Sequence, residues 1–408
     1  MSGGAWAKIW AVAELLLKQL VRIIAFLWIR DRKLVACGAW SGKVYGDSPK
    51  YLVEYILTNS DLKVVWIGNE SVRAQLPKTN RVRFARMGSL RASLALLRAR
   101  TWVCCISIEW DLTTWPLEGR ALLINTWHGY SFKRNGGGTA AAAHGPRASL
   151  AGRIFKRLGL HRRPWLMIGG ERDAEKLLAG DPLYFRADRI LRTGTPTNDF
   201  LLARNRDEGY KRALREKYSR IIGFDPKKKI VTYLPTWRNS GTSLFSFYRL
   251  DDGAQEKWRC MLEDLNAVLI EKHHYRTLET YPVVGLSRCS IPISAEKQHE
   301  IDTNELLLIT DVLISDYSGT YQDFGILGRP CIHFMYDLDD YINNCSGLVD
   351  GWRDMLAGPM IQGESELLEI VRSNLKSPCY APAAGYEKTV AYQKGKACES
   401  VLKMIERC

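Results

Sequence analysis

Short polar motifs stand at the ends of apolar, β-rich runs along this chain, and this feature constrains the fold more than any other. The runs alternate with segments of helical period, which is typical of parallel sheets covered by helices. Such sheets bind ligands beyond the carboxyl ends of their strands, so the motifs predict one cleft that handles a phosphorylated substrate. The motifs are Asn125 to Gly129, Leu234 to Arg238, Lys272 to His274 and Ser315 to Gly319.

The alternation falls into two sets, separated by a charged stretch from Arg204 to Lys228. A chain of 408 residues is also too long for a single mid-sized core. We therefore expect two Rossmann-like domains facing across a cleft, at residues 33–205 and 206–408. The expected strands span residues 33–39, 63–67, 81–84, 101–106, 121–126, 165–168, 190–193, 230–234, 267–270, 290–293, 312–315 and 331–334.

The formal net charge of +14 indicates an anionic partner, which is nucleic acid, an acidic membrane surface or a polyphosphate-type substrate. Charge alone does not choose among these. The ten cysteines include no C-x-x-C pair, and Cys104 and Cys105 lie inside an apolar run. This favours a buried strand in a reducing, cytoplasmic location, and neither cysteines nor histidines have the spacing of a zinc site.

Residues 1–32 form a separate N-terminal segment. Between Trp6 and Trp28 it is strongly apolar, and its few polar side chains fall in one narrow sector of a helix. Lys18 and Arg22, midway along, disfavour a membrane span. We expect an amphipathic helix in the interface of an anionic bilayer, and the alternative is a helix packed on the protein's own core. The polar sector holds Lys8, Lys18, Gln19 and Arg22; the apolar face holds Trp6, Trp10, Leu16, Leu17, Leu20, Ile24 and Leu27.

His128 follows an apolar strand and precedes Gly129, a residue that lets backbone approach a ligand closely. Near neutral pH such a histidine can accept a proton from an attacking hydroxyl. Lys133 and Arg134, just downstream, are candidates to hold phosphate. Taken alone, a histidine in this position is also compatible with a structural role.

Lys272 and His274 lie on the same side of the next strand end by strand alternation, and together they are able to bind a diphosphate. A solvated strand end is the alternative. Arg238, after Thr236 and Trp237, is either an anion clamp or a surface cation.

The strongest local signal runs from Thr310 to Asp323. A strand ends at Ser315, and Ser318 or a neighbour caps the following helix, whose free N–H groups bind phosphate well. Asp316 would orient the turn and Asp323 would contact a ligand hydroxyl. Simple N-capping without a ligand is the alternative. The acidic residues at 337, 339 and 340 read as a solvated turn and helix start rather than a metal site.

As a set, these residues resemble the CDP-glycerol glycerophosphotransferase family of teichoic-acid and capsule synthesis. The resemblance runs from about Lys33 to near the C-terminus, and several motifs in the right order make it specific. The matching segments are Asn125–Gly129 (HG), Pro235–Arg238 (PTWR), Lys272–His274 (K-x-H), Asp311–Asp323 (D-V-L-I-x-D-Y-S-S-x-x-x-D), Tyr45–Leu52, and Arg329-Pro330 through Leu338.

The resemblance implies an α/β, GT-B-like fold, with an N-terminal acceptor domain facing the membrane and a C-terminal domain that binds the CDP donor. It implies that His128 and His274 are the catalytic residues, with His128 as the base, and that His274, Lys272 and Arg238 contact the diphosphate. Gly129, Thr236, Trp237 and Asp316 belong to the same motifs and are included among the donor-binding candidates. Ser318, Gly319 and Asp323 match the donor-binding segment of the family.

The chain departs from the family pattern at three positions. Thr197 replaces an arginine that reaches the donor phosphate, Gly319 replaces a serine and Tyr275 replaces a proline. One lost cation weakens donor binding by roughly 1–3 kcal/mol if nothing replaces it. A different alditol donor, or another cation in its place, is therefore open.

We expect a transferase peripheral to the cytoplasmic face of the bacterial cell membrane. It would move glycerol phosphate, or a related polyol phosphate, from CDP-glycerol or CDP-ribitol to a hydroxyl of a lipid-linked or polymeric glycan acceptor, releasing CMP. Neither a cofactor, nor a metal, nor nucleic acid is expected to take part. One alternative is a GT-B glycosyltransferase that uses a nucleotide sugar. The other is a non-catalytic protein whose basic surface binds lipid or nucleic acid.

Overall fold

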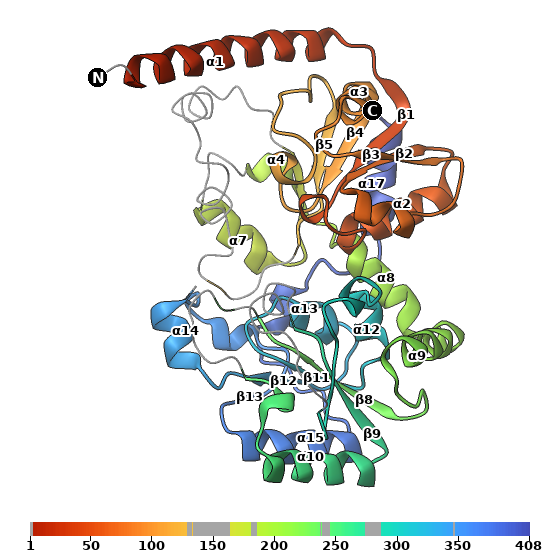
Figure 1. Cartoon of the computed structure of the whole chain (residues 1–408), viewed down its shortest axis with the longest axis vertical. Helices are drawn as coiled ribbons and strands as arrows, with labels where there is room; N and C mark the ends of the chain where they lie inside the picture. The colour runs from red at the N-terminus through yellow and green to blue at the C-terminus, as the bar shows by residue number, and fades with distance from the viewer. Residues whose placement is uncertain are drawn as a thin grey trace. The chain divides into compact units, whose positions relative to one another are not determined.

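Two parallel sheets organise the chain (Figure 1). The computed structural model describes residues 3–128, 133, 164–180, 186–236, 238, 245–273, 287–345 and 347–408. The predictions for Gly129, Trp237 and His274 lie outside these residues. Contacts divide the chain into two units. The first holds Met1–His128, Gly137–Asp199 and Tyr392–Cys408, and the second holds Gly129–Gly136 and Phe200–Ala391.

The first sheet has the strand order β3-β2-β1-β4-β5-β6-β7, and every pair in it is parallel. The order reverses between β1 and β4, which is the point where sheets of this kind bind ligands. The strands are β1 (Asp31–Cys37), β2 (Lys63–Gly68), β3 (Val82–Arg86), β4 (Ala99–Cys104), β5 (Leu122–Asn125), β6 (Trp165–Met167) and β7 (Ile190–Leu191). The helices with them are α1 (Gly3–Leu27), η1 (Trp40–Gly42), α2 (Asp47–Asn59), η2 (Glu70–Gln75), α3 (Leu90–Arg98), α4 (Ile108–Asp111), α7 (Glu171–Gly180), η4 (Ala187–Arg189), α8 (Pro196–Asn205) and α17 (Ala397–Glu406).

The second sheet repeats this plan with the order β10-β9-β8-β11-β12-β13, again parallel throughout. Its order reverses between β8 and β11. The strands are β8 (Lys229–Leu234), β9 (Ala267–Glu271), β10 (Ile291–Pro292), β11 (Val312–Ser315), β12 (Cys331–Phe334) and β13 (Met360–Ile361). The helices with them are α9 (Glu208–Ile222), η5 (Phe247–Arg249), α10 (Asp252–Asp264), η6 (Lys297–His299), α12 (Thr303–Ile309), α13 (Thr320–Gly325), α14 (Leu338–Asn344), η7 (Trp352–Met355), α15 (Glu364–Lys376) and α16 (Tyr386–Thr389).

Each sheet is buried on both faces, which explains the continuous apolar runs in the sequence. Along β11, Leu313 packs into one core, whereas Val312 and Ile314 on either side of it pack into the core of the opposite face. The twelve predicted strands all occur, two with the predicted ends and the others with ends shifted by at most two residues. The two-residue strand β13 is an addition, because Met360 and Ile361 are too short a run to recognise.

The C-terminal helix α17 differs from the predicted domain ranges, which assigned residues 206–408 to the second domain. Its Val401 and Ile405 belong to the core of the first sheet, together with Val35, Leu52 and Ile56. An apolar helix stripe must cover some sheet face, but its sequence does not say which one. The first boundary also differs, because it falls after Asp199, inside α8.

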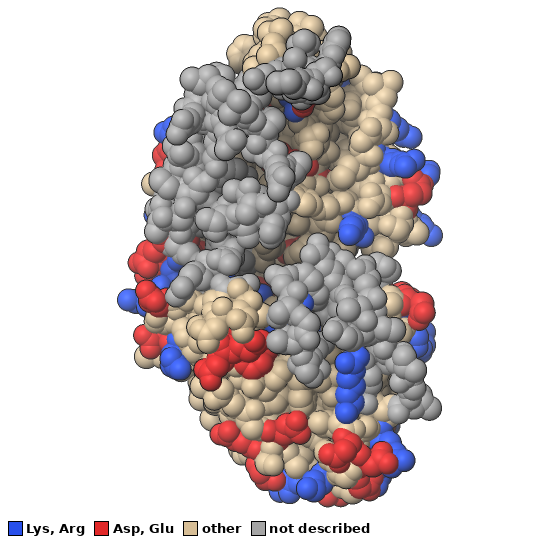
Figure 2. Space-filling model, turned by 60° about the vertical axis from the view of Figure 1, so that its left-hand side comes forward, with Lys and Arg blue, Asp and Glu red and all other residues tan. Residues whose placement is uncertain are grey.

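Helix α1 occupies the N-terminal segment. Ala25 is buried and Val21 packs against the core on one side of the first sheet, while Lys18, Gln19 and Arg22 are only partly exposed. Most of the apolar side chains on α1 instead point to solvent. In Figure 2, the described part of the upper end of the molecule, where α1 lies, shows few charged side chains. The exposed side chains are Trp10, Val12, Leu16, Leu17, Leu20, Ile23, Ile24, Phe26 and Leu27.

Arg30 fixes the end of this helix to the unit. Its guanidinium donates to the carbonyl oxygens of Leu96, Ala99 and Leu117 at 2.7–2.9 Å. Among the described helices, none is long and apolar enough to cross a membrane.

Candidate active site

His128 stands beyond the carboxyl end of β5, held by a tight turn. The Asn125 side chain accepts the Trp127 N–H at 2.8 Å and donates to the Ile106 carbonyl at 3.0 Å. Trp127 adopts a left-handed backbone, with φ of 58°, and projects His128 into solvent. The Nδ1 atom of His128 lies 3.2 Å from the Cys105 carbonyl oxygen. Because a carbonyl only accepts, this contact makes Nδ1 the donor and leaves the lone pair on Nε2.

Two tryptophan rings flank this imidazole. The Trp40 ring meets it edge-on at 5.6 Å between centroids, and the Trp127 ring lies at 4.8 Å. Trp40 comes from η1, which follows β1, the strand at the reversal point of the first sheet. The histidine is thus solvent-exposed on one side and fixed by aromatic rings on others.

Two buried carboxyl groups lie behind His128. Burial raises the pKa of Asp47, against hydrogen bonds to its carboxylate and the charge of His128. Burial also raises the pKa of Asp111, against hydrogen bonds from the N–H groups of Ile106, Ser41 and Cys105. Both carboxyl groups therefore carry a desolvation cost beside an imidazole.

Backbone strain gathers at the same place. Of the five non-glycine residues with positive φ in the described part of the chain, four surround His128: Trp40, Ser41, Asp47 and Trp127, with φ of 50–58°. A left-handed backbone costs a residue with a side chain about 1–3 kcal/mol, and such residues cluster where function requires them. The fifth, Asn266, lies at a tight turn before β9.

The reversal point of the second sheet is held by Asp316. Leu234 and Ser315 are register partners at the ends of β8 and β11, so the residues that follow them lie side by side. The carboxylate of Asp316 accepts the N–H of Thr236 at 2.9 Å and its hydroxyl at 2.7 Å. Asp316 thereby fixes the loop after β8, rather than only its own turn.

Arg238 is buried in this arrangement, with 2% of its side chain exposed. Its guanidinium contacts Asp316 at 2.9 Å and Asp337 at 2.7 Å, and it donates to the Thr236 carbonyl at 2.7 Å. Burial opposes the charged form, but the two carboxylates outweigh it and raise the pKa of Arg238. Asp337, with 11% of its side chain exposed, is thus an ion-pair partner of a buried arginine, which corrects the expectation of a solvated turn.

Aromatic rings complete the enclosure of Arg238. Tyr317 and Tyr341 stack at 3.6 Å between centroids, and the guanidinium carbon lies 4.9 and 5.0 Å from their rings. The Tyr317 hydroxyl also donates to Asp337 at 3.1 Å. The sequence suggested a guanidinium that faces phosphate, whereas the structure surrounds it with two carboxylates and two rings.

Two lysines of the second unit have a lowered pKa. Burial lowers the pKa of Lys272 to about 8, and its Nζ donates to the Gln298 side chain at 2.9 Å. Burial also lowers the pKa of Lys133 to about 8, although nearby Asp316 acts in the opposite direction. A lysine that gains an anionic partner recovers its charge, so both side chains suit a site that a phosphate fills.

The segment after β11 has weaker hydrogen bonds than the Arg238 network. Ser318 Oγ accepts from the Thr320 hydroxyl at 3.0 Å, and its contact with the Thr320 N–H is long, at 3.4 Å. Gly319 is the N-cap of α13, whose first turn has no side-chain cap hydrogen bond. The predicted serine cap is therefore weak, and Ser318, Gly319 and Asp323 are all partly exposed.

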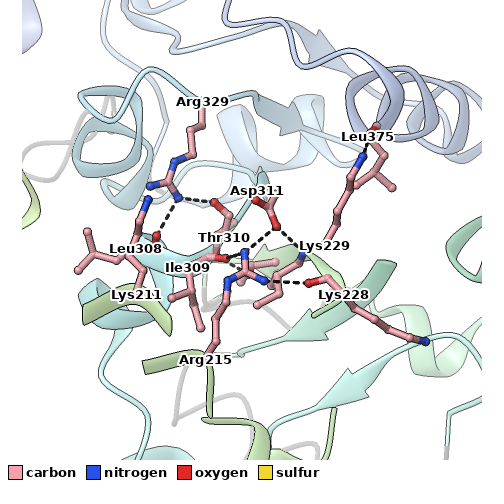
Figure 3. Close-up of polar contacts among 12 residues, drawn as sticks. Lys211, Arg215, Lys228, Lys229, Leu308, Ile309, Thr310, Asp311, Arg329 and Leu375 are labelled. Atoms are coloured by element: carbon pink, nitrogen blue, oxygen red, sulfur yellow. Dashed lines mark hydrogen bonds and ion pairs between the residues drawn. The ribbon is translucent and has the colours of Figure 1, made fainter. Parts of the chain in front are cut away.

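Other motif residues have structural partners (Figure 3). Arg215 and Arg329 point at the carbonyl groups that end α12, with Arg329 donating to Leu308 at 2.9 Å and Thr310 at 2.6 Å. Asp311 accepts the Ile230 N–H at 2.7 Å and Arg215 at 3.0 Å. The match of Asp311 and Arg329 to the family pattern is thus explained by capping and strand attachment.

Sequence reasoning missed the surroundings of His128. Asp47 and Thr197 were noted, one within a matching segment and one as a departure, but neither received a role. In the structure the Thr197 hydroxyl donates to Asp47 at 3.2 Å and contacts the Ser48 hydroxyl at 2.9 Å. Within the described ranges, no group of histidine, cysteine and acidic side chains has the arrangement of a metal site.

Two Rossmann-like sheets, each with polar side chains at its reversal point, define the GT-B-like class of transferases. A solved structure of the wall teichoic acid polymerase TagF has the same fold, with a TM-score of 0.72 at 22% identity over 100% of this chain and 98% of that one. The chain belongs to the CDP-glycerol:poly(glycerophosphate) glycerophosphotransferase family, whose model matches residues 20–407. The predictions of family, fold class and enzyme class are confirmed.

Curated relatives agree with this assignment. The teichoic acid glycerol-phosphate transferase of Staphylococcus aureus (strain NCTC 8325 / PS 47) is 25% identical over 381 residues, which cover 92% of this chain and 93% of that protein. The teichoic acid poly(glycerol phosphate) polymerase of Bacillus subtilis (strain 168) is 26% identical over 392 residues, covering 92% of this chain but only 48% of the polymerase.

Proposed function

We propose that this protein transfers glycerol phosphate, or a related polyol phosphate, from a CDP-alditol to a hydroxyl of a membrane-linked glycan or polymer, releasing CMP. Family membership supports the reaction class. A further TagF structure, of a histidine variant soaked with CDPG, indicates the donor that relative takes. The observation that carries the proposal is His128, exposed at a strand end with a free Nε2 lone pair and two buried carboxyl groups behind it.

In this mechanism the acceptor hydroxyl oxygen attacks the β-phosphorus of the donor, and its proton passes to Nε2 of His128. A P–O bond to the acceptor forms as the P–O bond to CMP breaks. The first unit would provide the base and the acceptor side. The second would hold the donor, with Lys272 and Lys133 supplying positive charge as negative charge moves onto CMP.

Arg238 has a different role in this proposal. Its positive charge already pairs with the carboxylates of Asp316 and Asp337, so it attracts a diphosphate only weakly. It instead keeps the loop after β8 and the segment after β11 in one arrangement. Thr236, Asp316, Ser318, Gly319 and Asp323 would line the donor site within that arrangement.

The test measures CMP release by the purified protein from CDP-glycerol and CDP-ribitol with lipid-linked acceptors. His128→Ala should lower turnover by about 10²–10⁴-fold with donor affinity nearly intact, because a general base acts in the transition state. The donor affinity is measured by calorimetry, and the thermal midpoint must stay near that of the parent protein. CMP release at the parental rate by His128→Ala rejects the base assignment. Turnover of UDP-sugars instead of CDP-alditols supports the nucleotide-sugar alternative.

Helix α1 supports a peripheral position on the cytoplasmic face of the membrane. It turns most of its apolar side chains to solvent, whereas Lys18, Gln19 and Arg22 are only partly exposed, which suits burial of the apolar face in a bilayer interface. The net charge of +14 favours an anionic membrane surface. In the described part of the face that Figure 2 shows, acidic and basic side chains are interspersed.

Vesicle sedimentation tests this position. Leu16→Glu/Leu20→Glu should reduce binding to vesicles that contain phosphatidylglycerol, while donor affinity stays unchanged, because both side chains already face water. Leu90→Glu, at an exposed leucine of α3, is the matched control. Equal binding by all three proteins contradicts the anchor, and salt-sensitive binding to random DNA without CMP release favours the non-catalytic alternative.

A further inference from the structure

Asp47 differs from the other carboxylate near His128 in the kind of partner it has. Asp111 accepts backbone N–H groups from Ser41, Cys105 and Ile106 at 2.7–2.9 Å, which is the pattern of a carboxylate that holds loops together. Asp47 accepts the indole N–H of Trp40 at 3.0 Å instead. It thus connects to the side chain whose ring edge touches the imidazole.

The remaining partners of Asp47 are also hydrogen-bond donors. The Ser48 N–H donates to Oδ1 at 2.7 Å and the Thr197 hydroxyl at 3.2 Å. Three donors converge on one buried carboxylate, which favours its ionised form against the cost of burial. The positive charge that the chain brings to this carboxylate is that of protonated His128.

The backbone is strained at both ends of this connection. Trp40 and Asp47 have φ of 50° and 57°, although neither is glycine. A sequence selected for stability alone would relieve these positions. The strain is explained if the two side chains must reach one another and the imidazole.

We propose that Asp47, acting with Trp40, is a positioning residue for His128: it orients the imidazole and stabilises the imidazolium that forms when the acceptor proton arrives. The inference rests on the proposed function for its catalytic consequence. The proton moves from the acceptor hydroxyl to Nε2, and Asp47 stays ionised throughout. The titratable groups whose charges act with that of His128 are Asp47 from α2 and Asp111 from α4, and the backbone carbonyl of Cys105, after β4, contacts Nδ1 of the ring.

The test uses the full chain with Asp47→Asn and Trp40→Phe. Asp47→Asn removes the charge, whereas Trp40→Phe removes only the N–H and keeps an aromatic ring against His128. Turnover of CDP-glycerol should fall about 10–100-fold in Asp47→Asn and less in Trp40→Phe, with KM for the donor within about twofold. Asp61→Asn makes the same chemical change at an exposed carboxylate of the first unit and should leave turnover unchanged.

A second measurement does not depend on turnover. The ring resonance of His128, assigned by its loss in His128→Gln, is followed by NMR through a pH titration. Its midpoint should move to lower pH in Asp47→Asn, because the protonated ring loses a neighbouring negative charge, and should stay in place in Asp61→Asn. A midpoint that does not move overturns the inference. If the parent protein releases no CMP from any CDP-alditol, the proposed function fails, and the titration still decides the role of Asp47.

Trp40→Phe guards against misfolding of Asp47→Asn. If Asp47→Asn does not fold, a smaller shift of the same sign in Trp40→Phe supports the inference and an unchanged midpoint overturns it. A merely structural role for Asp47 predicts a lower thermal midpoint with no change in the titration of His128.

Discussion

The two polar sites at the sheet ends are built on opposite principles. In the second unit, the charge of Arg238 is balanced by Asp316 and Asp337, and stacked tyrosine rings cover it. In the first unit, His128 is exposed, the backbone around it is strained, and the hydrogen bonds described above reach Asp47 from neutral donors: an indole N–H, a backbone N–H and a hydroxyl. A network in which opposite charges already pair holds its residues in one arrangement. A buried carboxylate beside a neutral imidazole can instead stabilise the charge that the imidazole gains when it takes up a proton.

Under the proposed function, this difference separates residues that shape a site from residues that act in it. Arg238 has the residue type of an anion clamp, but its partners leave it little to offer a ligand. His128 has few partners of its own and is positioned by its neighbours. The comparison therefore predicts that substitutions in the Arg238 network cost mainly stability, and substitutions around His128 cost mainly turnover.

The largest effect should come from Arg238→Ala. It leaves the largely buried carboxylates of Asp316 and Asp337 uncompensated, so the free energy of unfolding should fall by about 3–5 kcal/mol in urea denaturation. His128→Gln, at an exposed side chain, should change it by only about 0.5 kcal/mol. Arg206→Ala, at an exposed arginine, controls for the loss of charge. A similar fall in the free energy of unfolding for Arg238→Ala and His128→Gln would contradict the distinction between the two sites.

A smaller loss is expected for Arg329→Ala. This arginine donates to backbone carbonyl groups at the end of α12 and to the Asn205 side chain, so its removal mainly leaves neutral acceptors without donors. The free energy of unfolding should fall by about 1–3 kcal/mol, and donor affinity in the folded protein should be unchanged. If the free energy of unfolding falls as much in Arg329→Ala as in Arg238→Ala, the pairing of Arg238 with carboxylates is not what makes its removal costly.

The smallest effect concerns the pH dependence of donor binding. Lys272 and Lys133 both have a pKa of about 8, lowered by burial, so they are charged below that pH and lose charge as pH rises through it. CDP-glycerol affinity should therefore fall between about pH 7 and 9, by about tenfold for each lost charge. Lys133→Gln/Lys272→Gln should bind weakly at both pH values and flatten the dependence. The exposed Lys257→Gln should keep it, and an unchanged slope in the double variant rejects the role of both lysines.

The strands were predictable because a parallel sheet buried on both faces needs continuous apolar runs, and the charged stretch before β8 separates two sets of them. Contacts between residues far apart in the sequence were not predictable. Asp337 lies 99 residues from Arg238, and nothing in either local sequence indicates that they pair. The motif around His128 was visible, but its partners Trp40 and Asp47 come from an earlier strand end, and only the folded sheet brings them together.

The return of α17 to the first sheet has a consequence for biosynthesis. Val401 and Ile405 complete a core begun by Val35 and Leu52, so a ribosome that has finished the first sheet has not yet supplied everything needed to close it. The first unit must wait, partly uncovered, while the whole of the second is translated. Throughout that interval α1 already displays its apolar side chains, so the membrane binding proposed above does not have to wait for the second unit.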